Sequence, residues 1–230
     1  NTKKYPLIKL QNTNSSELSK VLENSYRAVN IAFIEEWSRF SEDIGVDLYD
    51  VLKAIKTRDT HNNIRYPGFG VGGYCLTKDP LFGKIGSKQI FNLKNHNFLF
   101  SSNAIKINNN MPLVSVDKIV KYFNGSIKSK KILLLGASYR EDVEDTRFSP
   151  SEVFYKEVKR LGAKIDVYDP LINFWNEIKL KCLDRIPLNN NYDIVLLAVK
   201  HKQFQKIVFN HTTFKKKKLL VFDSNNILSK

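Results

Sequence analysis

The first half of the chain places apolar residues every three to four positions over long stretches, which is the spacing of α-helices. Four helices are predicted, over residues 15–45, 47–56, 76–85 and 92–123. The first has Ser15 or Ser16 at its start and Gly45 at its end. It is apolar on more than one side near Ala28–Ile34, as expected of a helix buried on two faces. The last one bends, breaks or restarts near Pro112.

The second half changes to a pattern in which short apolar runs, typical of buried strands, alternate with helical segments. Strands are predicted over residues 131–136, 163–167, 194–199 and 219–222. Helices are predicted over residues 150–161, 171–180 and 201–208. Strand and helix alternating at this spacing indicate a doubly wound parallel sheet, which binds ligands beyond the carboxyl ends of its strands.

Together the two patterns predict an α/β chain with a helical domain over residues 1–125 and a Rossmann-like domain over residues 126–230. The two long helices are too apolar to form a globule by themselves. We therefore expect them to form a dimer interface or a spine between the domains. No apolar run is long enough to predict a membrane span, and the N-terminus lacks the apolar segment of a secretion signal.

Charge and cysteine content narrow the classes of function. The chain has 37 basic and 23 acidic residues, a net charge of +14, which could serve nucleic acid or a phosphorylated metabolite. The lysines are spread widely, with one dense run at Lys215–Lys218, and no nucleic-acid-reading motif accompanies them, so we expect no nucleic-acid partner. The two cysteines, Cys75 and Cys182, do not indicate a disulfide framework, which favours a reducing cytoplasm. No metal site is predicted.

The segment from Tyr66 to Pro80 combines a glycine-rich loop with a cysteine. Four glycines in six positions let another molecule approach the backbone, which predicts a loop that wraps a ligand. Lys78 and Asp79 follow Cys75 by three and four positions. If a helix begins near Cys75, its N-terminus favours a thiolate and Asp79 shares its face. These residues indicate covalent catalysis, although a lone cysteine is more often a small buried hydrophobic residue.

Two further groups of polar residues stay open to two interpretations each. Lys20, Asn24 and Arg27 form a stripe on the first helix, either a solvated face or a face toward the glycine loop. Arg140 and Arg147 lie in the long loop over 137–149, where they either bind phosphate or pair with acidic neighbours. The turn before this loop is not G-x-G-x-x-G, so the dinucleotide fingerprint is missing.

Five segments in order along the chain carry a resemblance to a known family. They are Lys20–Asn24 (KVLEN), Asn30–Glu36 (NIAFIEE), Gly68–Asp79 (GFGVGGYCLTKD), Gly136–Ser151 (GASYREDVEDTRFSPS) and Val167–Pro170 (VYDP). They resemble the nucleotide-sugar 6-dehydrogenases of the UDP-glucose/GDP-mannose dehydrogenase family. That family begins with an N-terminal NAD-binding domain. The resemblance here covers only the central dimerisation domain and the C-terminal UDP-binding domain, without that N-terminal domain.

The resemblance implies a homodimer that oxidises the C6 alcohol of a UDP-sugar to a uronic acid with NAD. Cys75 is then the nucleophile, which passes through a thiohemiacetal and a thioester. Lys20 and Asn24 would steady the oxyanion and water, and Asp79 would orient or activate water. The implied substrate-binding residues are Ile64, Arg65, Tyr66, Pro67, Gly68, Gly72 and Arg140. The implied NAD contacts are Lys78 and Arg147.

Three points stay open at this stage. Asn225 stands where many relatives have an arginine, which leaves that nucleotide contact open. The segment Gly73–Leu76 resembles UDP-glucose enzymes, whereas Arg58, His61 and Asn62–Ile64 resemble enzymes of N-acetylated UDP-hexosamines. The alternative function is that of an inactive fragment that binds a nucleotide-sugar or dimerises.

Overall fold

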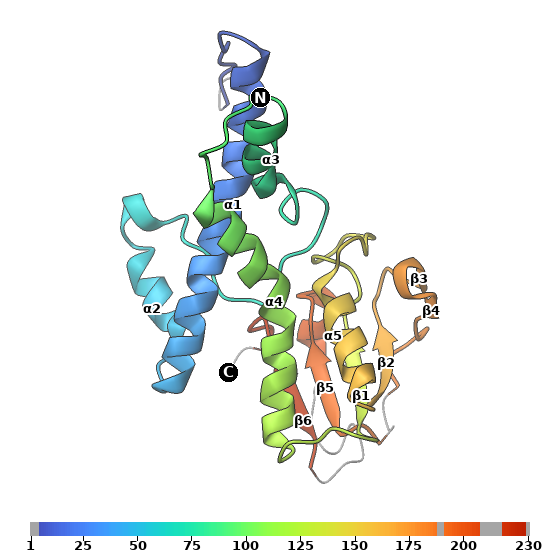
Figure 1. Cartoon of the computed structure of the whole chain (residues 1–230). Helices are drawn as coiled ribbons and strands as arrows, with labels where there is room; N and C mark the ends of the chain where they lie inside the picture. Colours follow the sequence, from blue (N-terminus) through green and yellow to red (C-terminus); the bar gives the residue numbers. More distant parts are fainter. Residues whose placement is uncertain (1–4, 188–190, 208–217, 229–230) are drawn as a thin grey trace.

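The computed structural model describes residues 5–187, 191–207 and 218–228. Its first half is built on α1 (Thr13–Asp43), a helix of 31 residues (Figure 1). The side chain of Asn12 caps this helix by accepting a hydrogen bond from the Ser15 N–H, so the helix begins before Ser15. Gly45 follows its end with φ +70°, as predicted. The other helices of this half are α2 (Leu48–Ile55), η1 (Asp59–His61), η2 (Asp79–Leu81), α3 (Phe82–Gln89) and α4 (Leu99–Tyr122).

The prediction of a helix over residues 76–85 is wrong in its position. The chain passes Cys75 in turns, and the 3₁₀ helix η2 and then α3 start only at Asp79 and Phe82. Lys78 has φ −137°, which is not helical, and Pro80 fits the first turn of a helix rather than its interior. Cys75 therefore does not lie at a helix N-terminus.

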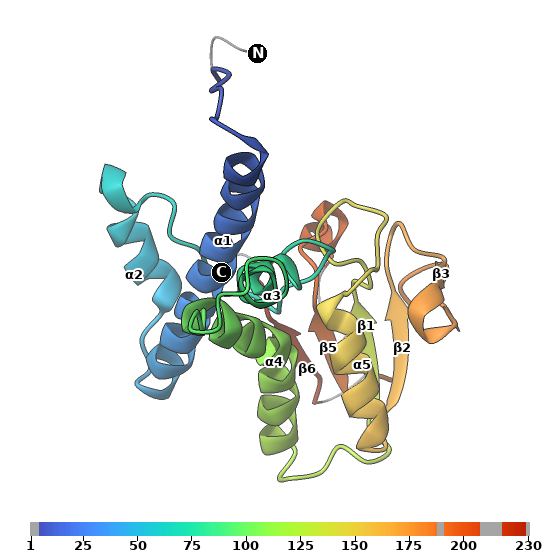
Figure 2. The same cartoon turned by 45° about the horizontal axis from the view of Figure 1, so that its top comes forward.

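The second long helix, α4, is shorter at its start than predicted. Asn92 and Phe98 both have positive φ, which ends any helix before Leu99. Pro112 lies inside the helix, which continues through it. Because proline has no N–H, one intrahelical hydrogen bond is missing there, and the axis of α4 changes direction partway along (Figure 2).

The second half contains a four-stranded parallel sheet in the order β2-β1-β5-β6. Its elements are β1 (Lys131–Leu135), α5 (Pro150–Arg160), β2 (Lys164–Tyr168), β5 (Ile194–Leu197) and β6 (Leu220–Asp223). Strand β1 pairs with β2 on one side and with β5 on the other, so the strand order reverses between β1 and β5. In an open α/β sheet this reversal marks the place where ligands bind.

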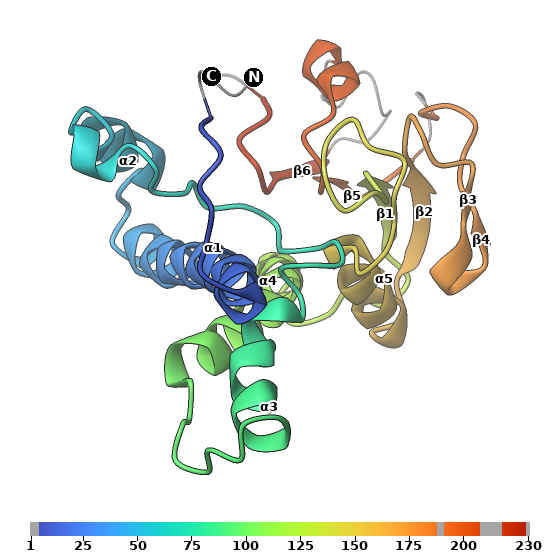
Figure 3. The same cartoon turned by 90° about the horizontal axis from the view of Figure 1, so that it is seen from above.

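The two faces of the sheet follow from the alternation of side chains along each strand. Ile132 and Leu134 face α4 and α5, whereas Leu133 and Leu135 face the cluster around Phe204 of the 3₁₀ helix η4 (Lys202–Lys206). Seen from above, α4 and α5 lie on one side of the sheet and η4 on the other (Figure 3). The predicted doubly wound α/β arrangement is confirmed.

One predicted helix of this half is wrong. Residues 171–180 form β3 (Phe174–Trp175), the 3₁₀ helix η3 (Asn176–Ile178) and the start of β4 (Leu180–Lys181). Trp175 is fully buried in the sheet core, and Lys179 has a left-handed backbone with φ +51°, which ends any helix there. Residue 208, the last of the predicted helix over 201–208, and the lysine run 215–217 lie outside the described residues.

Helix α4 connects the two halves as a spine. Ala104 in its first half packs against Ala28 and Ala32 of α1, and Ile119 in its second half belongs to the core of the sheet. The core therefore crosses from one half to the other before residue 125, and the division at 125/126 stays a prediction. In the described part of the chain, no helix is long and apolar enough to cross a membrane.

Candidate functional site

The glycine loop lies against the segment that joins β1 to α5. A Cβ atom at Gly70 would lie 2.6 Å from Pro150, and one at Gly72 would lie 2.7 Å from Tyr139 and 2.8 Å from the carbonyl oxygen of Phe148. The glycines at these two positions thus allow the backbone to approach the chain's own second half. This contact brings the cysteine loop and the end of the sheet into one site.

Asn225 completes this junction. Its Oδ1 accepts a hydrogen bond of 3.1 Å from the Phe69 N–H, and its Nδ2 donates one of 2.7 Å to the carbonyl of Ala198, just beyond β5. Asn225, at a position where the resemblance leads one to expect an arginine, therefore ties the glycine loop to the strand ends. Sequence reasoning identified the departure but not this role, because it depends on a contact across 156 residues.

The two cysteines occupy opposite environments. Cys75 is exposed on a turn. Its backbone carbonyl accepts hydrogen bonds from the N–H groups of Lys78 and Asp79, at 3.3 and 2.9 Å. Cys182 is buried in the sheet core, and burial, together with the nearby Asp169 carboxylate, raises the pKa of its thiol to about 11. Of the two thiols, Cys75 is the one that solvent and a ligand can reach.

A chain of hydrogen bonds joins α1 to the turn after Cys75. Asn24 is fully buried, and its Nδ2 donates to Asp79 Oδ2 at 2.8 Å. Lys78 Nζ lies 2.9 Å from the other oxygen of Asp79, and this hydrogen bond raises the pKa of the lysine. The Oδ1 of Asn24 is buried and, within the described residues, has no hydrogen-bond partner. An unpaired buried acceptor of this kind calls for a water molecule or a ligand.

Lys20 stands apart from this chain of hydrogen bonds. Its Nζ lies 3.7 Å from Glu23 Oε2 on the same helix, and both side chains are more than half exposed. Within the described part of the chain it forms no hydrogen bond or ion pair with Asn24 or Asp79. The structure thus joins Asn24, Lys78 and Asp79 next to Cys75 but leaves Lys20 one helical turn away.

The two arginines of the loop after β1 differ in their partners. Arg147 pairs with Asp145 at 2.7 Å, and the hydrogen bonds of this pair lower the pKa of the Asp145 carboxyl. Arg140 is exposed, and among the described residues its side chain has no hydrogen bond or ion pair. The interpretation that these arginines pair with acidic neighbours therefore holds for Arg147 and not for Arg140.

Arg140 lines a cavity of about 200 Å³ at the ends of β1 and β5, together with Gly70, Lys200 and Asn225. An adjoining open cleft of about 670 Å³ extends past Tyr66, Pro67 and Gly68 toward α2. Both lie at the reversal of strand order. Four of the predicted substrate-binding residues thus line one continuous region. They are Tyr66, Pro67, Gly68 and Arg140.

Helix α2 contributes Tyr49, which sequence reasoning missed. Its ring stacks on Tyr66 with centroids 5.4 Å apart, and its hydroxyl donates to the carbonyl of Pro67 at 3.0 Å. Burial raises the pKa of this hydroxyl to about 12. The remaining predicted residues hold the loop through their backbones. Ile64 accepts from Lys56 Nζ, and the Arg65 N–H donates to Asn30.

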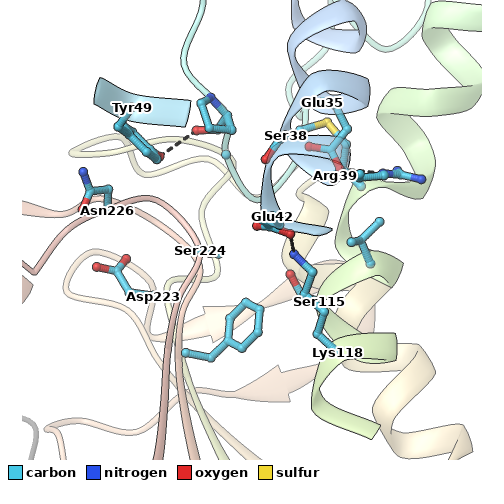
Figure 4. Close-up of a pocket in the computed structure, with 15 residues that line it drawn as sticks. Glu35, Ser38, Arg39, Glu42, Tyr49, Ser115, Lys118, Asp223, Ser224 and Asn226 are labelled. Carbon is cyan, nitrogen blue, oxygen red and sulfur yellow. Dashed lines mark hydrogen bonds and ion pairs between the residues drawn. The ribbon is translucent and has the colours of Figure 1, made fainter. Parts of the chain in front are cut away.

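A second cavity of about 240 Å³ opens between α1, α4 and the end of β6 (Figure 4). Glu35 is buried in its wall, and burial raises the pKa of its carboxyl, although Arg39 lies 3.2 Å away. Glu42 pairs with Lys118 across the same cavity. The helical pattern placed Glu35 on α1, but its burial depends on α4 and could not be predicted from that pattern alone.

A buried network holds the strand ends in place. Asp169 Oδ2 accepts the N–H groups of Ala137 and Ser138 at 2.8 and 2.9 Å, and it lies 3.2 Å from His201 Nε2. Burial alone would raise the pKa of this carboxyl, but the hydrogen bonds from His201, Ser138 and Leu171 hold it below its ordinary value. Within the described residues, no cluster of histidine, cysteine and carboxylate side chains could hold a metal ion.

The fold and this site define an α/β protein in which a cysteine loop lies against a cleft at the carboxyl ends of a parallel sheet. Residues 14–110 match the central domain of the UDP-glucose/GDP-mannose dehydrogenase family, and residues 133–230 match the UDP-binding domain of the same family. The chain belongs to the UDP-glucose/GDP-mannose dehydrogenase family.

Similar proteins from several organisms agree with this placement. A UDP-N-acetyl-D-mannosamine dehydrogenase of Methanococcus vannielii is 32% identical over 224 residues, which are 96% of this chain and 50% of that protein. One from Campylobacter jejuni is 30% identical and covers 86% of this chain and 48% of its own. The chain spans about half the length of the relatives it matches.

Solved structures show the same fold. The UDP-D-ManNAc dehydrogenase of Pyrococcus horikoshii is 25% identical, with a TM-score of 0.81 over 95% of this chain and 50% of that one. An NDP-N-acetyl-D-galactosaminuronic acid dehydrogenase of Methanosarcina mazei Go1 is 23% identical, with a TM-score of 0.84 over 94% of this chain and 47% of that one.

Proposed function

We propose that this chain supplies the cysteine and the nucleotide cleft of a dehydrogenase that oxidises the C6 alcohol of a UDP-sugar to a uronic acid. One observation carries the proposal. At one end of the glycine loop, Gly68 lines the cleft at the strand ends. At the other end, Cys75 lies beside Asp79, which is hydrogen-bonded to Asn24. A ligand with a nucleotide at one end and a reacting group at the other would lie along such a loop.

The proposed reaction balances as two oxidations and a hydrolysis. The C6 alcohol loses a hydride and a proton and becomes an aldehyde. The thiolate of Cys75 adds to the carbonyl carbon, and the oxygen takes up a proton to give a thiohemiacetal. Loss of a second hydride and a proton leaves a thioester, which water cleaves to the carboxylate and the thiol. NAD⁺, when bound, would supply the hydride acceptor for both oxidations.

Asn24 and Asp79 suit the hydrolytic step. Asp79 follows Cys75 by one turn, and its carboxylate can orient the attacking water. The Nδ2 of Asn24 holds Asp79, and its Oδ1, which has no partner among the described residues, can accept a hydrogen bond from a water at the same place. Lys20 would contribute only after leaving Glu23, and breaking an exposed pair of this kind costs little.

The residues present fit one part of NAD. Lys78 and Arg147, the predicted cofactor contacts, both lie over the ring of Tyr74, the residue before Cys75. They can hold an anionic portion of the cofactor near the cysteine. The turn after β1 lacks the glycine fingerprint, so we expect the adenosine half to need an N-terminal NAD-binding domain outside this chain. The chain alone should form no NADH from a UDP-sugar, and appreciable turnover would contradict this expectation.

The similar proteins favour an N-acetylated hexosamine as the sugar. The relatives from Methanococcus vannielii and Campylobacter jejuni are both UDP-N-acetyl-D-mannosamine dehydrogenases, at 32% and 30% identity. We therefore propose UDP-N-acetyl-D-mannosamine ahead of UDP-glucose. The alternative is an inactive fragment that binds a nucleotide-sugar or dimerises.

We further propose that the chain forms a homodimer through α1. Phe33, Trp37 and Phe40 form a row of contacting rings on this helix and are each about half exposed. A row of large aromatic side chains is costly to leave in water. Trp37→Glu should shift sedimentation toward the monomer, while Tyr122→Glu, a similarly exposed tyrosine on α4, should not. A wild-type chain that sediments only as a monomer at high concentration would contradict the proposal.

Calorimetry with UDP tests the nucleotide end of the proposal. The wild-type chain should bind UDP weakly without the N-terminal domain. Arg140→Ala should weaken binding roughly ten- to hundredfold, since a lost charge-assisted hydrogen bond costs about 1.5–3 kcal/mol. Arg160→Ala, an exposed arginine on α5 that pairs with Glu157, is the matched control and should bind as the wild type does. If the wild type binds no UDP at millimolar concentration, the nucleotide assignment fails.

A further inference from the structure

Tyr74 stands between the two cations next to the cysteine. Lys78 Nζ lies 4.8 Å from the centre of its ring and the guanidinium carbon of Arg147 lies 5.5 Å from it, both within the range of cation–π attraction. The ring of Phe148 meets Tyr74 edge-on at 5.6 Å. Lys78 comes from the cysteine loop and Arg147 from the loop after β1, so one aromatic ring joins the two halves of the molecule.

The backbone around Tyr74 is held in place from both sides. The Gly73 N–H donates to the carbonyl of Arg147 at 3.1 Å, and the Thr77 hydroxyl donates to the carbonyl of Gly73 at 2.8 Å. Gly73 has φ +81°, which a residue with a side chain adopts only with strain. The ring thus stands on a fixed turn, although it is itself about half exposed.

The charges of this cluster balance, but its hydrogen-bond donors are not used up. Asp79 accepts from Lys78 and Asp145 accepts from Arg147, so the four side chains have no net charge. A lysine has three N–H donors and an arginine five. In the described part of the chain, Lys78 uses one on Asp79, and Arg147 uses its Nε and Nη2 on Asp145. The remaining donors can serve an anion that approaches the ring.

We propose that Tyr74 is a positioning residue that holds Lys78 and Arg147 over one ring, so that the two side chains form a seat for a diphosphate beside Cys75. A diphosphate offers separate oxygens to the point charge of a lysine and to the fork of an arginine. Asp79 and Asp145 each hold one of these side chains, and Lys78 Nζ also lies 4.6 Å from the centre of the Phe82 ring. The Tyr74 ring is the contact that the two side chains share, and it restricts their rotamers together, which lowers the ordering cost that opposes binding. This role rests on the proposed function and adds Tyr74 to its residues.

The test uses inorganic pyrophosphate as the probe and calorimetry as the readout. Every variant is made in the Arg140→Ala chain, so that the cleft at the strand ends does not contribute. Tyr74→Leu should weaken pyrophosphate binding about five- to thirtyfold, because two cation–π contacts are lost. Tyr74→Phe keeps the ring and should stay within about twofold. Tyr122→Leu, an exposed tyrosine on α4, should have no effect.

A coupling measurement separates positioning from a merely structural role. Lys78→Gln and Arg147→Gln are made singly and together. When Tyr74 is present, the loss of pyrophosphate binding free energy in the double variant should differ from the sum of the two single losses. In the Tyr74→Leu chain the two should be equal. Unchanged binding in Tyr74→Leu, or an equal loss in Tyr74→Phe, would overturn the role of the ring. If the chain with Arg140 intact binds UDP but the Arg140→Ala chain binds no pyrophosphate, the seat is refuted while the proposed function stands. If, in addition, the chain with Arg140 intact binds no UDP, both the seat and the proposed function are refuted.

Discussion

The two ends of the glycine loop are built in opposite ways. At the nucleotide end, Asp169 is buried and satisfied by several donors, and Asn225 joins the loop to the strand ends. At the end near Cys75, Cys75 and Tyr74 are exposed on turns, and Asn24 has a buried oxygen without a hydrogen-bond partner in the described part of the chain. A prearranged cleft can select a ligand, whereas an incompletely satisfied site is suited to take up a reacting group and water. Under the proposed function, this difference separates binding from chemistry along one loop.

The largest expected effect breaks the prearranged end. Asp169→Asn replaces an acceptor of two backbone N–H groups and His201 with a partly mismatched amide. The free energy of unfolding should fall by about 2–4 kcal/mol, because buried charge-assisted hydrogen bonds are lost. Asp145→Asn makes the same chemical change at the pair with Arg147, whose side chain is 61% exposed, and should change the stability less. If urea denaturation gives the two variants the same free energy of unfolding, the two ends of the loop do not differ in how firmly they are held.

A smaller loss of stability is expected when a side chain is added at Gly72, where the glycine loop lies close to the segment that joins β1 to α5. The Cβ of Gly72→Ala would lie 2.8 Å from a backbone oxygen that cannot move easily, so the variant should lose about 1–3 kcal/mol of stability. Gly86→Ala on α3 is the control, since its Cβ meets nothing nearer than 3.9 Å. It should gain about 0.5–1 kcal/mol, because alanine favours a helix. Thermal unfolding of the two variants decides the matter.

The smallest effect concerns pH. The pKa of Asp169 is lower in the folded chain than its ordinary value, so its ionised form stabilises the fold above that value. This contribution should be lost as the pH falls through the folded pKa, below about 3.9. The stability difference between the wild type and Asp169→Asn should therefore shrink in acid. A difference that is constant down to pH 2 would show that Asp169 does not act through its charge.

Local patterns predicted much of the fold. The strands β1, β2, β5 and β6 followed from apolar runs, and α5 matches the helix predicted over residues 150–161. The errors arose where backbone geometry or burial outweighed the pattern. Residues 171–180 look helical, but Trp175 enters the sheet core and Lys179 turns left-handed. No pattern of apolar residues records that competition.

The site was predictable in its parts and not in its connections. Cys75, Lys78 and Asp79 follow one another in the sequence, and the resemblance adds Asn24. The roles of Tyr49, Asn225 and His201 depend on contacts between distant segments, so sequence reasoning missed them. Lys20 shows the converse. A spacing of four on a helix places it next to Asn24, but its charge pairs with Glu23 instead.

The cysteines give the most direct test that one ligand joins both ends of the loop. In the folded chain, iodoacetamide should modify the exposed Cys75 much faster than the buried Cys182. Peptide mapping measures the two rates. Saturating UDP-N-acetyl-D-mannosamine should slow the modification of Cys75 severalfold, because its sugar would cover the thiol, while saturating UDP should slow it little. The account is contradicted if the UDP-sugar binds by calorimetry and leaves the rate at Cys75 unchanged, or if Cys182 reacts first.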